Sequence, residues 1–150
     1  MATSTSAPSA GFYELVPHPA SVPEARRLAV AAAPAYMTDE QRSKLELAVT
    51  EVVANAVRHS GSDAAIRLIL TAKDDHFCVR VIDGGAGLVP RPGAMGSEPG
   101  AGFGLFLLEQ VTKRWGMTRE AGCTRVWFEL DYMPNGKPIT GLGSCLAAEA

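Results

Sequence analysis

The stretch from Leu45 to Ser60 constrains the fold most strongly, because its pattern requires a long helix with one buried face. Its apolar residues recur at intervals of three and four positions, the spacing of one face of an α-helix. They are Leu45, Ala48, Val49, Val52, Val53, Ala56 and Val57. Glu51, Asn55 and His59 recur at intervals of four, so they form a polar stripe beside that apolar face. The sequence therefore places a carboxylate, an amide and an imidazole together at the edge of the core.

Asn55 needs an explanation, because an asparagine inside a helix competes with the backbone for hydrogen bonds. Taken alone, this helix allows a plain interpretation, in which Asn55 is a solvated polar residue and Glu51 a surface charge. Two glycine clusters later in the chain favour a functional interpretation instead.

The composition is that of a soluble globular protein whose 150 residues suffice for one domain with one core. Charged residues make up 20% and hydrophobic ones 47%, and the formal charge is -2. This balance provides no basic footprint for direct nucleic-acid binding.

The cysteines and the hydropathy indicate a cytoplasmic protein. Cys78, Cys123 and Cys145 are odd in number and lack C-x-x-C spacing, so neither a disulfide framework nor a zinc site is expected. No apolar run approaches the ~20 residues that cross a bilayer, and the N-terminus does not resemble a signal peptide. We expect no membrane association.

The first half of the chain predicts one strand and two helices. Phe12 to Val16 is a β-type run closed by prolines, so it is expected at a sheet edge. Ser21 is the expected N-cap of a helix that runs to about Ala33. Thr38 is the expected N-cap of the second helix, which continues to about His59.

The second half of the chain predicts mainly strands. The expected strands are Ala65–Thr71, His76–Ile82, Met117–Glu120 and Thr124–Leu130. The first two form a hairpin, and the last two are joined by a tight turn at Ala121-Gly122. A sheet of this kind is most economically covered by helices on one face. We therefore predict an α+β fold, a two-layer α/β sandwich with helices packed on one face of a mixed, mainly antiparallel sheet.

Glycine clusters bracket the region between the hairpin and the last helix. Asp83-Gly84-Gly85-Ala86-Gly87 follows the second hairpin strand, and Gly100-Ala101-Gly102-Phe103-Gly104-Leu105 opens a helix that runs to about Arg114. The segment 88–100 between them is rich in proline and glycine and is expected to be a mobile lid. The flanks, residues 1–10 and 132–150, are expected to be disordered, which leaves one domain over 11–131.

The second glycine cluster predicts an anion site. Unpaired N–H groups at the start of its helix, together with the helix dipole, favour a phosphate. The usual phosphate motifs are absent, since there is no G-x-x-x-x-G-K-[ST] and no dinucleotide fingerprint in a βαβ setting.

The first glycine cluster suits the base of a nucleotide. Asp83 ends a strand and can accept a hydrogen bond from an exocyclic amine, while Gly85 and Gly87 let a ring lie against the backbone.

The helix stripe suits the phosphate end of the same nucleotide. Asn55 carries an oxygen suited to Mg²⁺, and Glu51 can accept a proton from a hydroxyl or water that attacks the terminal phosphate. Arg58 and His59 can neutralise phosphate charge from the same end of the helix.

Three motifs in this order resemble the boxes of the GHKL or Bergerat-fold ATPases. They are Glu51-x-x-x-Asn55, Asp83-x-Gly85-x-Gly87 and Gly102-x-Gly104-Leu105. The resemblance covers about residues 12–130 and is greatest to the stand-alone bacterial branch of anti-sigma-factor serine/threonine kinases.

The resemblance implies a Bergerat fold with ATP under the lid and a role for each motif residue. Asn55 is the Mg²⁺ ligand, Asp83 binds the adenine amino group, Glu51 is the catalytic base and Thr124 supports Asp83 through water. The full set of expected nucleotide contacts is Asn55, Arg58, His59, Asp83, Gly85, Gly87, Gly100, Gly102, Phe103, Gly104, Leu105 and Thr124.

The resemblance also implies a homodimer that sequesters a sigma factor and phosphorylates a serine of its antagonist protein. A sensor histidine kinase is not expected, since the helical hairpin with a phospho-accepting histidine is missing and His59 lies within the nucleotide helix. Two alternatives stay open: a nucleotide-dependent binding module without phosphotransfer, and, more remotely, an interaction domain that has lost nucleotide binding.

Outside these motifs, plain interpretations are expected. Arg26 and Arg27 on the first helix are taken as solvated charges, and His18 and His76 as surface residues.

Overall fold

The computed structural model of this chain describes residues 10–60, 63–84, 103–120 and 122–131. Its helices are α1 (Ser21–Ala32), α2 (Asp39–His59) and α3 (Phe103–Val111). Its strands are β1 (Ala10–Leu15), β2 (Ile66–Ala72), β3 (His76–Asp83), β4 (Arg114–Glu120) and β5 (Cys123–Asp131). The expected lid over 88–100 and the tail over 132–150 lie outside the described residues, as do residues 1–9 of the expected disordered start.

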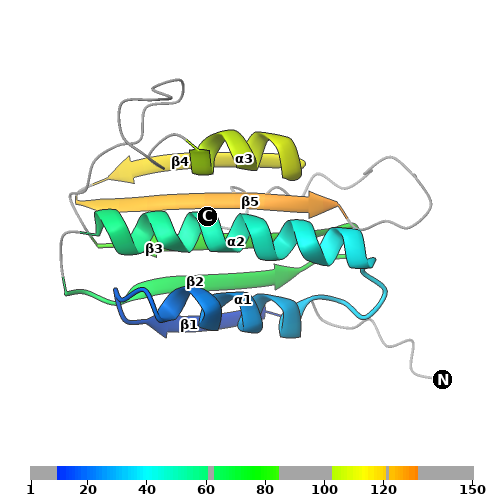
Figure 1. Cartoon of the computed structure of the whole chain (residues 1–150), viewed down its shortest axis with the longest axis horizontal. Helices are drawn as coiled ribbons and strands as arrows, with labels where there is room; N and C mark the ends of the chain where they lie inside the picture. Colours follow the sequence, from blue (N-terminus) through cyan, green and yellow to red (C-terminus); the bar gives the residue numbers. More distant parts are fainter. Residues whose placement is uncertain (1–9, 61–62, 85–102, 121, 132–150) are drawn as a thin grey trace.

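The five strands form one sheet in the order β1-β2-β3-β5-β4. Every pairing between neighbouring strands is antiparallel. The three helices lie on one face of this sheet, with β1 and β4 at its two edges (Figure 1). The prediction of an α+β sandwich with helices on one face is confirmed, and so is the edge position of the first strand.

The strand registers give the sheet a helix-covered face and a far face. Phe77, Val79 and Val81 of β3 belong to the core beneath the helices. Because side chains alternate along a strand, Cys78 and Arg80 point to the far face. Register places Trp127 of β5 opposite Arg80, so it also lies on the far face. This alternation decides which residues can take part in a site beneath the helices.

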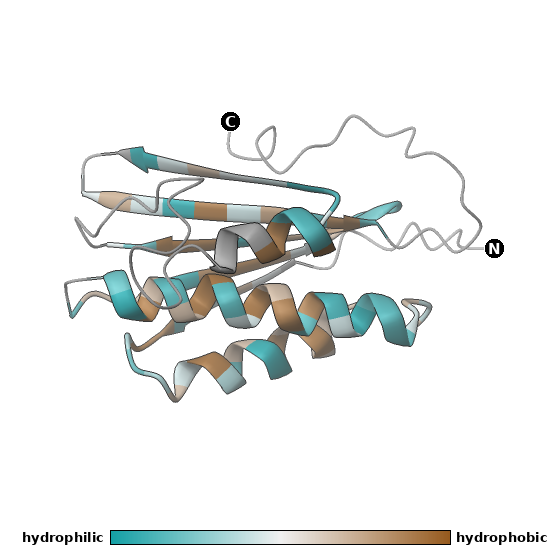
Figure 2. Cartoon of the chain, turned by 45° about the horizontal axis from the view of Figure 1, so that its top comes forward, coloured by the Kyte–Doolittle hydropathy of each residue, from teal (hydrophilic) through white to brown (hydrophobic). Residues whose placement is uncertain are grey.

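Helix α2 is the centre of the core. Leu45, Val49 and Val53 are fully buried, and burying each such side chain contributes about 1.5–3 kcal/mol. Ala25 and Ala29 of α1 are also fully buried, and such small side chains let α1 lie close to its neighbours. In Figure 2 the first turns of α2 are hydrophilic and hydrophobic colour begins further along, where its buried face starts. The pattern that predicted this helix therefore also determines its position against the sheet.

The predicted N-cap is correct for α2 and wrong for α1. Thr38 is the N-cap of α2 as expected, and it forms a capping box with Gln41, in which each side chain accepts a hydrogen bond from the other residue's backbone N–H. Helix α1, by contrast, has Ala20 as its N-cap, and Ser21 is its first helical residue. The Ser21 hydroxyl instead donates to the Val16 carbonyl oxygen at 2.7 Å, which closes the turn between β1 and α1. Ser21 as a cap was therefore wrong.

The boundary between α3 and β4 also differs from the prediction. Helix α3 ends at Val111 instead of about Arg114, and β4 begins at Arg114 instead of Met117. The reason is a backbone hydrogen bond from Lys113 N–H to the Glu129 carbonyl oxygen of β5, 2.9 Å long, which takes the chain into the sheet. Gly122, in the turn that follows β4, has a φ of 77°, a conformation that favours glycine.

Two expectations for single residues are wrong. His76 is buried, with 3% of its surface exposed, whereas the other predicted surface histidine, His18, is exposed. Cys78 is disulfide-bonded, contrary to the expectation drawn from the cysteine count, while Cys123 is a free thiol. Among the residues that the structure describes, no helix combines the length and the hydropathy needed to cross a membrane.

Candidate nucleotide-binding site

The second half of α2 carries the polar stripe. Glu51 and Asn55 are both half-buried and lie one helical turn apart, next to the fully buried face of the helix. In the last turn, Arg58 is exposed and His59 is half-buried. The stripe therefore runs along the boundary between the core and the surface, as the spacing predicted.

Asp83 is the last residue of β3 and is buried, with 6% of its surface exposed. It follows Val79 and Val81 at intervals of two, so its side chain lies on the face that the helices cover. A carboxylate at this position can accept a hydrogen bond from an amino group of a ligand beneath the helices.

Thr124 lies directly opposite Asp83 in the register of β3 and β5. Its side chain is half-buried and shares the helix-covered face, since opposite residues of an antiparallel pair point the same way. The structure thus brings together two predicted site residues that are far apart in the sequence.

The end of α2, the start of β2 and the end of β3 lie at the same end of the sheet. Helix α2 ends at His59, and β2 begins soon after it, at Ile66. The register of β2 with β3 sets Arg67 opposite Ile82, so the start of β2 lies beside the end of β3. Figure 1 shows this end on the left of the view, together with the end of α2 and the start of β5, while α3 begins nearer the middle of the sheet. Helix α2 also contacts both β3 and α3.

The glycine clusters are described only in part. Gly85, Gly87, Gly100 and Gly102 lie outside the described residues. Phe103, Gly104 and Leu105 form the first turn of α3, which is where the sequence predicted an anion site. The first four backbone N–H groups of a helix have no partner within it, so this turn can bind a phosphate.

The profile of the histidine kinase-like ATPase domain matches residues 15–130. The chain belongs to this family. The predicted family is thereby confirmed, and because these domains are ATPases the assignment implies that the chain binds ATP. A search of curated protein sequences finds no match.

Two solved structures share the fold of this histidine kinase-like ATPase domain. One contains the RsbU and RsbW domains of Rv1364c from Mycobacterium tuberculosis, with a TM-score of 0.61 and 18% sequence identity. The match covers 81% of this chain and 32% of that one, so this chain spans about a third of its neighbour's length. The other is the histidine kinase AdeS of Acinetobacter baumannii, with a TM-score of 0.51, 9% identity, and coverage of 81% of this chain and 68% of that one.

The residues of this ATPase domain fit Mg²⁺ only if ATP supplies most of the ligands. No group of three or more His, Cys, Asp or Glu residues within the described ranges could hold a metal by itself. Asn55 offers one hard oxygen, and Glu51 lies one turn away. Mg²⁺ is usually held in this way, by one or two protein oxygens together with phosphates and water.

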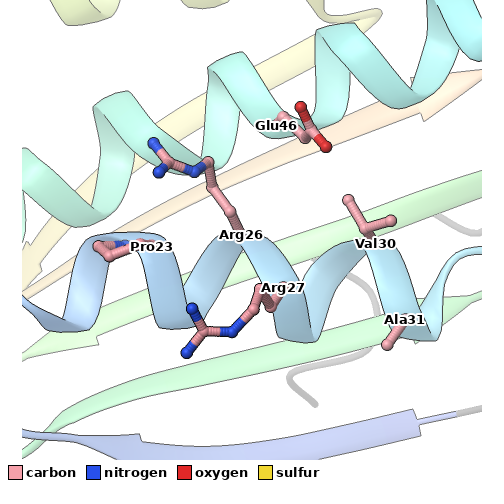
Figure 3. Close-up of a pocket in the computed structure, with 6 residues that line it drawn as sticks. All are labelled: Pro23, Arg26, Arg27, Val30, Ala31 and Glu46. Atoms are coloured by element: carbon pink, nitrogen blue, oxygen red, sulfur yellow. The ribbon is translucent and has the colours of Figure 1, made fainter.

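The domain also has a cavity of about 410 Å³ between α1 and α2 (Figure 3). Its lining residues are Pro23, Arg26, Arg27, Val30, Ala31 and Glu46. None of them is a predicted nucleotide contact. Arg26 donates from Nη1 to Thr50 Oγ1 at 3.2 Å and so joins the two helices, which corrects its interpretation as a solvated charge.

Sequence reasoning missed a polar cluster at the opposite end of β3. His76 Nδ1 lies 2.7 Å from Asp75 Oδ1, and Nε2 lies 3.9 Å from Glu129 Oε1. The signal was available in part, since two aspartates precede His76 in the hairpin turn. The contribution of Glu129 depends on the pairing of β3 with β5, which no local pattern reveals.

Proposed function

We propose that this protein is an ATP-binding anti-sigma regulatory factor with serine/threonine protein kinase activity. The observation that carries the proposal is the placement of Glu51 and Asn55 on α2 and of Asp83 opposite Thr124, at one end of the sheet. Membership of the histidine kinase-like ATPase family supports the nucleotide part. The similarity to a structure that contains an RsbW domain supports the choice of the anti-sigma branch.

In the proposed complex, Asp83 accepts a hydrogen bond from the adenine amino group, and Thr124 supports it through a water molecule. Gly85 and Gly87 let the base lie against the backbone. The phosphates then reach the start of α3, where Gly102 and Gly104 permit close approach to the backbone N–H groups. Arg58 and His59 add positive charge near the same phosphates.

The proposed reaction transfers the γ-phosphoryl group of ATP to a serine hydroxyl of a protein substrate. The serine oxygen forms a bond to the γ-phosphorus while the bond from that phosphorus to the β–γ bridging oxygen breaks, which releases ADP. Glu51 accepts the proton that the serine hydroxyl loses. Asn55 would hold Mg²⁺ together with the phosphates, and the bound ion would neutralise charge on the phosphate oxygens.

The proposed partners follow from the family resemblance. The substrate is the antagonist protein of a sigma factor, and the sigma factor itself is the protein that this domain sequesters. The proposal also places the protein in the cytoplasm, as a homodimer.

The test separates binding from transfer with two variants. Calorimetry with ATP, with and without Mg²⁺, is expected to show saturable binding in wild type and in Glu51→Gln, and Mg²⁺-dependent weakening in Asn55→Ala. Mass spectrometry of a candidate antagonist incubated with ATP is then expected to find phosphoserine with wild type only.

Three results would contradict the proposed kinase function in whole or in part. Phosphoserine formed by Glu51→Gln at the wild-type rate contradicts the role of Glu51 as base. Tight ATP-dependent complexes without phosphoserine support the binding module instead. Absence of ATP binding by a folded protein contradicts both functions.

A further inference from the structure

The far face of the sheet is buried along its middle, although the three described helices lie on the other face (Figure 1). Cys78 of β3 is 2% exposed and Trp127 of β5 is 8% exposed, and the two form an apolar cluster separate from the core. Phe12 of the edge strand β1 lies on the same far face, opposite Ile69, which in turn lies opposite Arg80. Phe12 is 58% exposed, so the burial is strongest along β3 and β5.

The packing of Trp127 shows that a further layer lies above this face. Its ring lies against Gly116 of β4, since a Cβ added to Gly116 would be 2.7 Å from Trp127 Cε2. The sheet therefore covers one face of the ring, and a ring that is almost fully buried needs cover on its other face as well. Among the described residues, all three helices lie on the opposite side of the sheet, so the cover comes from a part of the chain outside the described ranges.

The disulfide bond of Cys78 identifies that part of the chain. Cys78 is disulfide-bonded and Cys123 is a free thiol. The chain has three cysteines, which leaves Cys145 as the partner of Cys78 within the chain. Cys145 belongs to the segment 132–150, and no other stretch outside the described ranges contains a cysteine.

We propose that residues 132–150 cover the far face of the sheet and are fastened there by a disulfide bond between Cys78 and Cys145. The occupant of this face is thus a segment of the chain itself. Its role is independent of nucleotide binding, because Asp83 and the polar stripe of α2 lie on the helix-covered face or beside the core.

The length of the segment suits this attachment. Strand β5 ends at Asp131, which faces His76, and Cys78 is two positions further along β3, about 7 Å away. Cys145 follows Asp131 by 14 positions, a stretch that reaches about 46 Å when extended. The chain must therefore turn back to bring Cys145 to Cys78, and the prolines and glycines between 132 and 144 permit such turns.

The residues after Cys145 are complementary to the far face. Leu146 and the two alanines that follow it are apolar, as the surface around Trp127 requires. Glu149 comes four positions after Cys145, and four extended residues span about 13 Å, the length of four residues of β3. Arg80 and Arg125 lie within that distance of Cys78 in the strand register, and the Nε atom of each is buried. A carboxylate placed there compensates buried positive charge.

The disulfide bond makes the cover responsive to thiols. When the bond forms, the thiols of Cys78 and Cys145 together lose two electrons and two protons to a small-molecule disulfide such as glutathione disulfide, which becomes two thiols. A dithiol such as dithiothreitol returns two electrons and two protons and becomes a cyclic disulfide. Reduction therefore releases the fixed attachment of residues 132–150, and Trp127 becomes accessible.

Mass spectrometry of the full chain tests the bond. The protein is equilibrated with glutathione disulfide, alkylated without reduction and digested. The expected result is a peptide pair that links Cys78 to Cys145, obtained from monomeric chains, with Cys123 alkylated. Alkylation of all three cysteines overturns the proposal, as does a bond from Cys78 to a second chain.

Acrylamide quenching of tryptophan fluorescence tests the cover. The quenching constant of oxidised wild type is expected to rise on addition of dithiothreitol, because Trp127 loses its cover. Cys123→Ser is the matched control and is expected to show the same rise. Cys145→Ser is expected to show the higher constant with and without dithiothreitol. Equal quenching of oxidised and reduced wild type contradicts the cover, even where the bond exists.

The thiol–disulfide equilibrium separates docking of the segment from simple linkage. In a glutathione buffer it reports the effective concentration of Cys145 at Cys78. Glu149→Lys is expected to lower that concentration, because it brings like charge to Arg80 and Arg125, whereas Lys137→Glu is expected to leave it undiminished. An unchanged equilibrium in Glu149→Lys contradicts docking of Glu149 beside the arginines. No step uses ATP, so these results are independent of the proposed kinase activity.

Discussion

Asp83, the first residue of the motif Asp83-x-Gly85-x-Gly87, is the proposed contact of the adenine amino group. Its place after a run of alternating apolar residues predicted a strand end, and the structure adds that it is buried on the helix-covered face. At the scale of a single residue, the proposed selection of adenine depends on this carboxylate acting as a hydrogen-bond acceptor.

Replacing Asp83 with Asn is therefore expected to weaken ATP binding. The amide offers a donor where the adenine amino group needs an acceptor, and loss of a charge-assisted hydrogen bond costs about 1.5–3 kcal/mol, or roughly 10- to 100-fold in Kd. Calorimetric titration with Mg·ATP measures the effect. Asp74→Asn, in the exposed β2–β3 turn, is the control and is expected to bind like wild type. Equal affinity for both variants would remove Asp83 from the site.

At the scale of an element, helix α2 contributes both to the core and to the candidate site. Its apolar face forms the centre of the core, and its polar stripe supplies Glu51 and Asn55 one turn apart. The orientation of the stripe is therefore determined by the packing of the helix as a whole. The start of the helix is stabilised separately, by the capping box of Thr38 and Gln41.

The capping box predicts a measurable loss of stability in Thr38→Ala. The substitution leaves the Gln41 backbone N–H without its acceptor, 3.1 Å away in the structure, and removal of such a cap costs about 0.5–2 kcal/mol. Urea unfolding monitored by circular dichroism is the measurement. The control is Ser43→Ala at an exposed position inside the same helix, where Ala is the better helix former and no loss is expected. Equal stability of the two variants would contradict the role of the cap.

Most elements of the molecule could be predicted from local patterns. Period 3.6 identified α2 and period 2 identified β3, because each buries one face against a single core. The errors arose where a distant contact decides the outcome. Ser21 closes a turn through Val16, and Lys113 enters the sheet through Glu129, so neither boundary could be read locally.

The candidate site was predictable in residue types and only partly in geometry. The spacing of Glu51 and Asn55 alone implied their common stripe, since a helix maps sequence distance onto space. The pairing of Asp83 with Thr124 depends on the strand order β3-β5-β4. In this order β4, the next strand in the sequence after β3, lies at the edge of the sheet, and β5 lies between the two. Strand order of this kind is set by the global packing and has no signal in a short window.

The proposed binding of ATP at one end of the sheet would stabilise the whole molecule. A nucleotide that contacts α2, β3 and the start of α3 binds only the folded chain, so it stabilises that state by mass action. At 100 times Kd the gain is about 2.7 kcal/mol, and for a domain of this size it corresponds to a rise in Tm of roughly 5–10 °C. Thermal unfolding with and without Mg·ATP measures the shift. Glu51→Gln is expected to keep the full shift, because the proposed role of Glu51 is in phosphoryl transfer, whereas Asp83→Asn is expected to lose most of it at the same ATP concentration. An equal shift in both variants would place ATP elsewhere on the molecule.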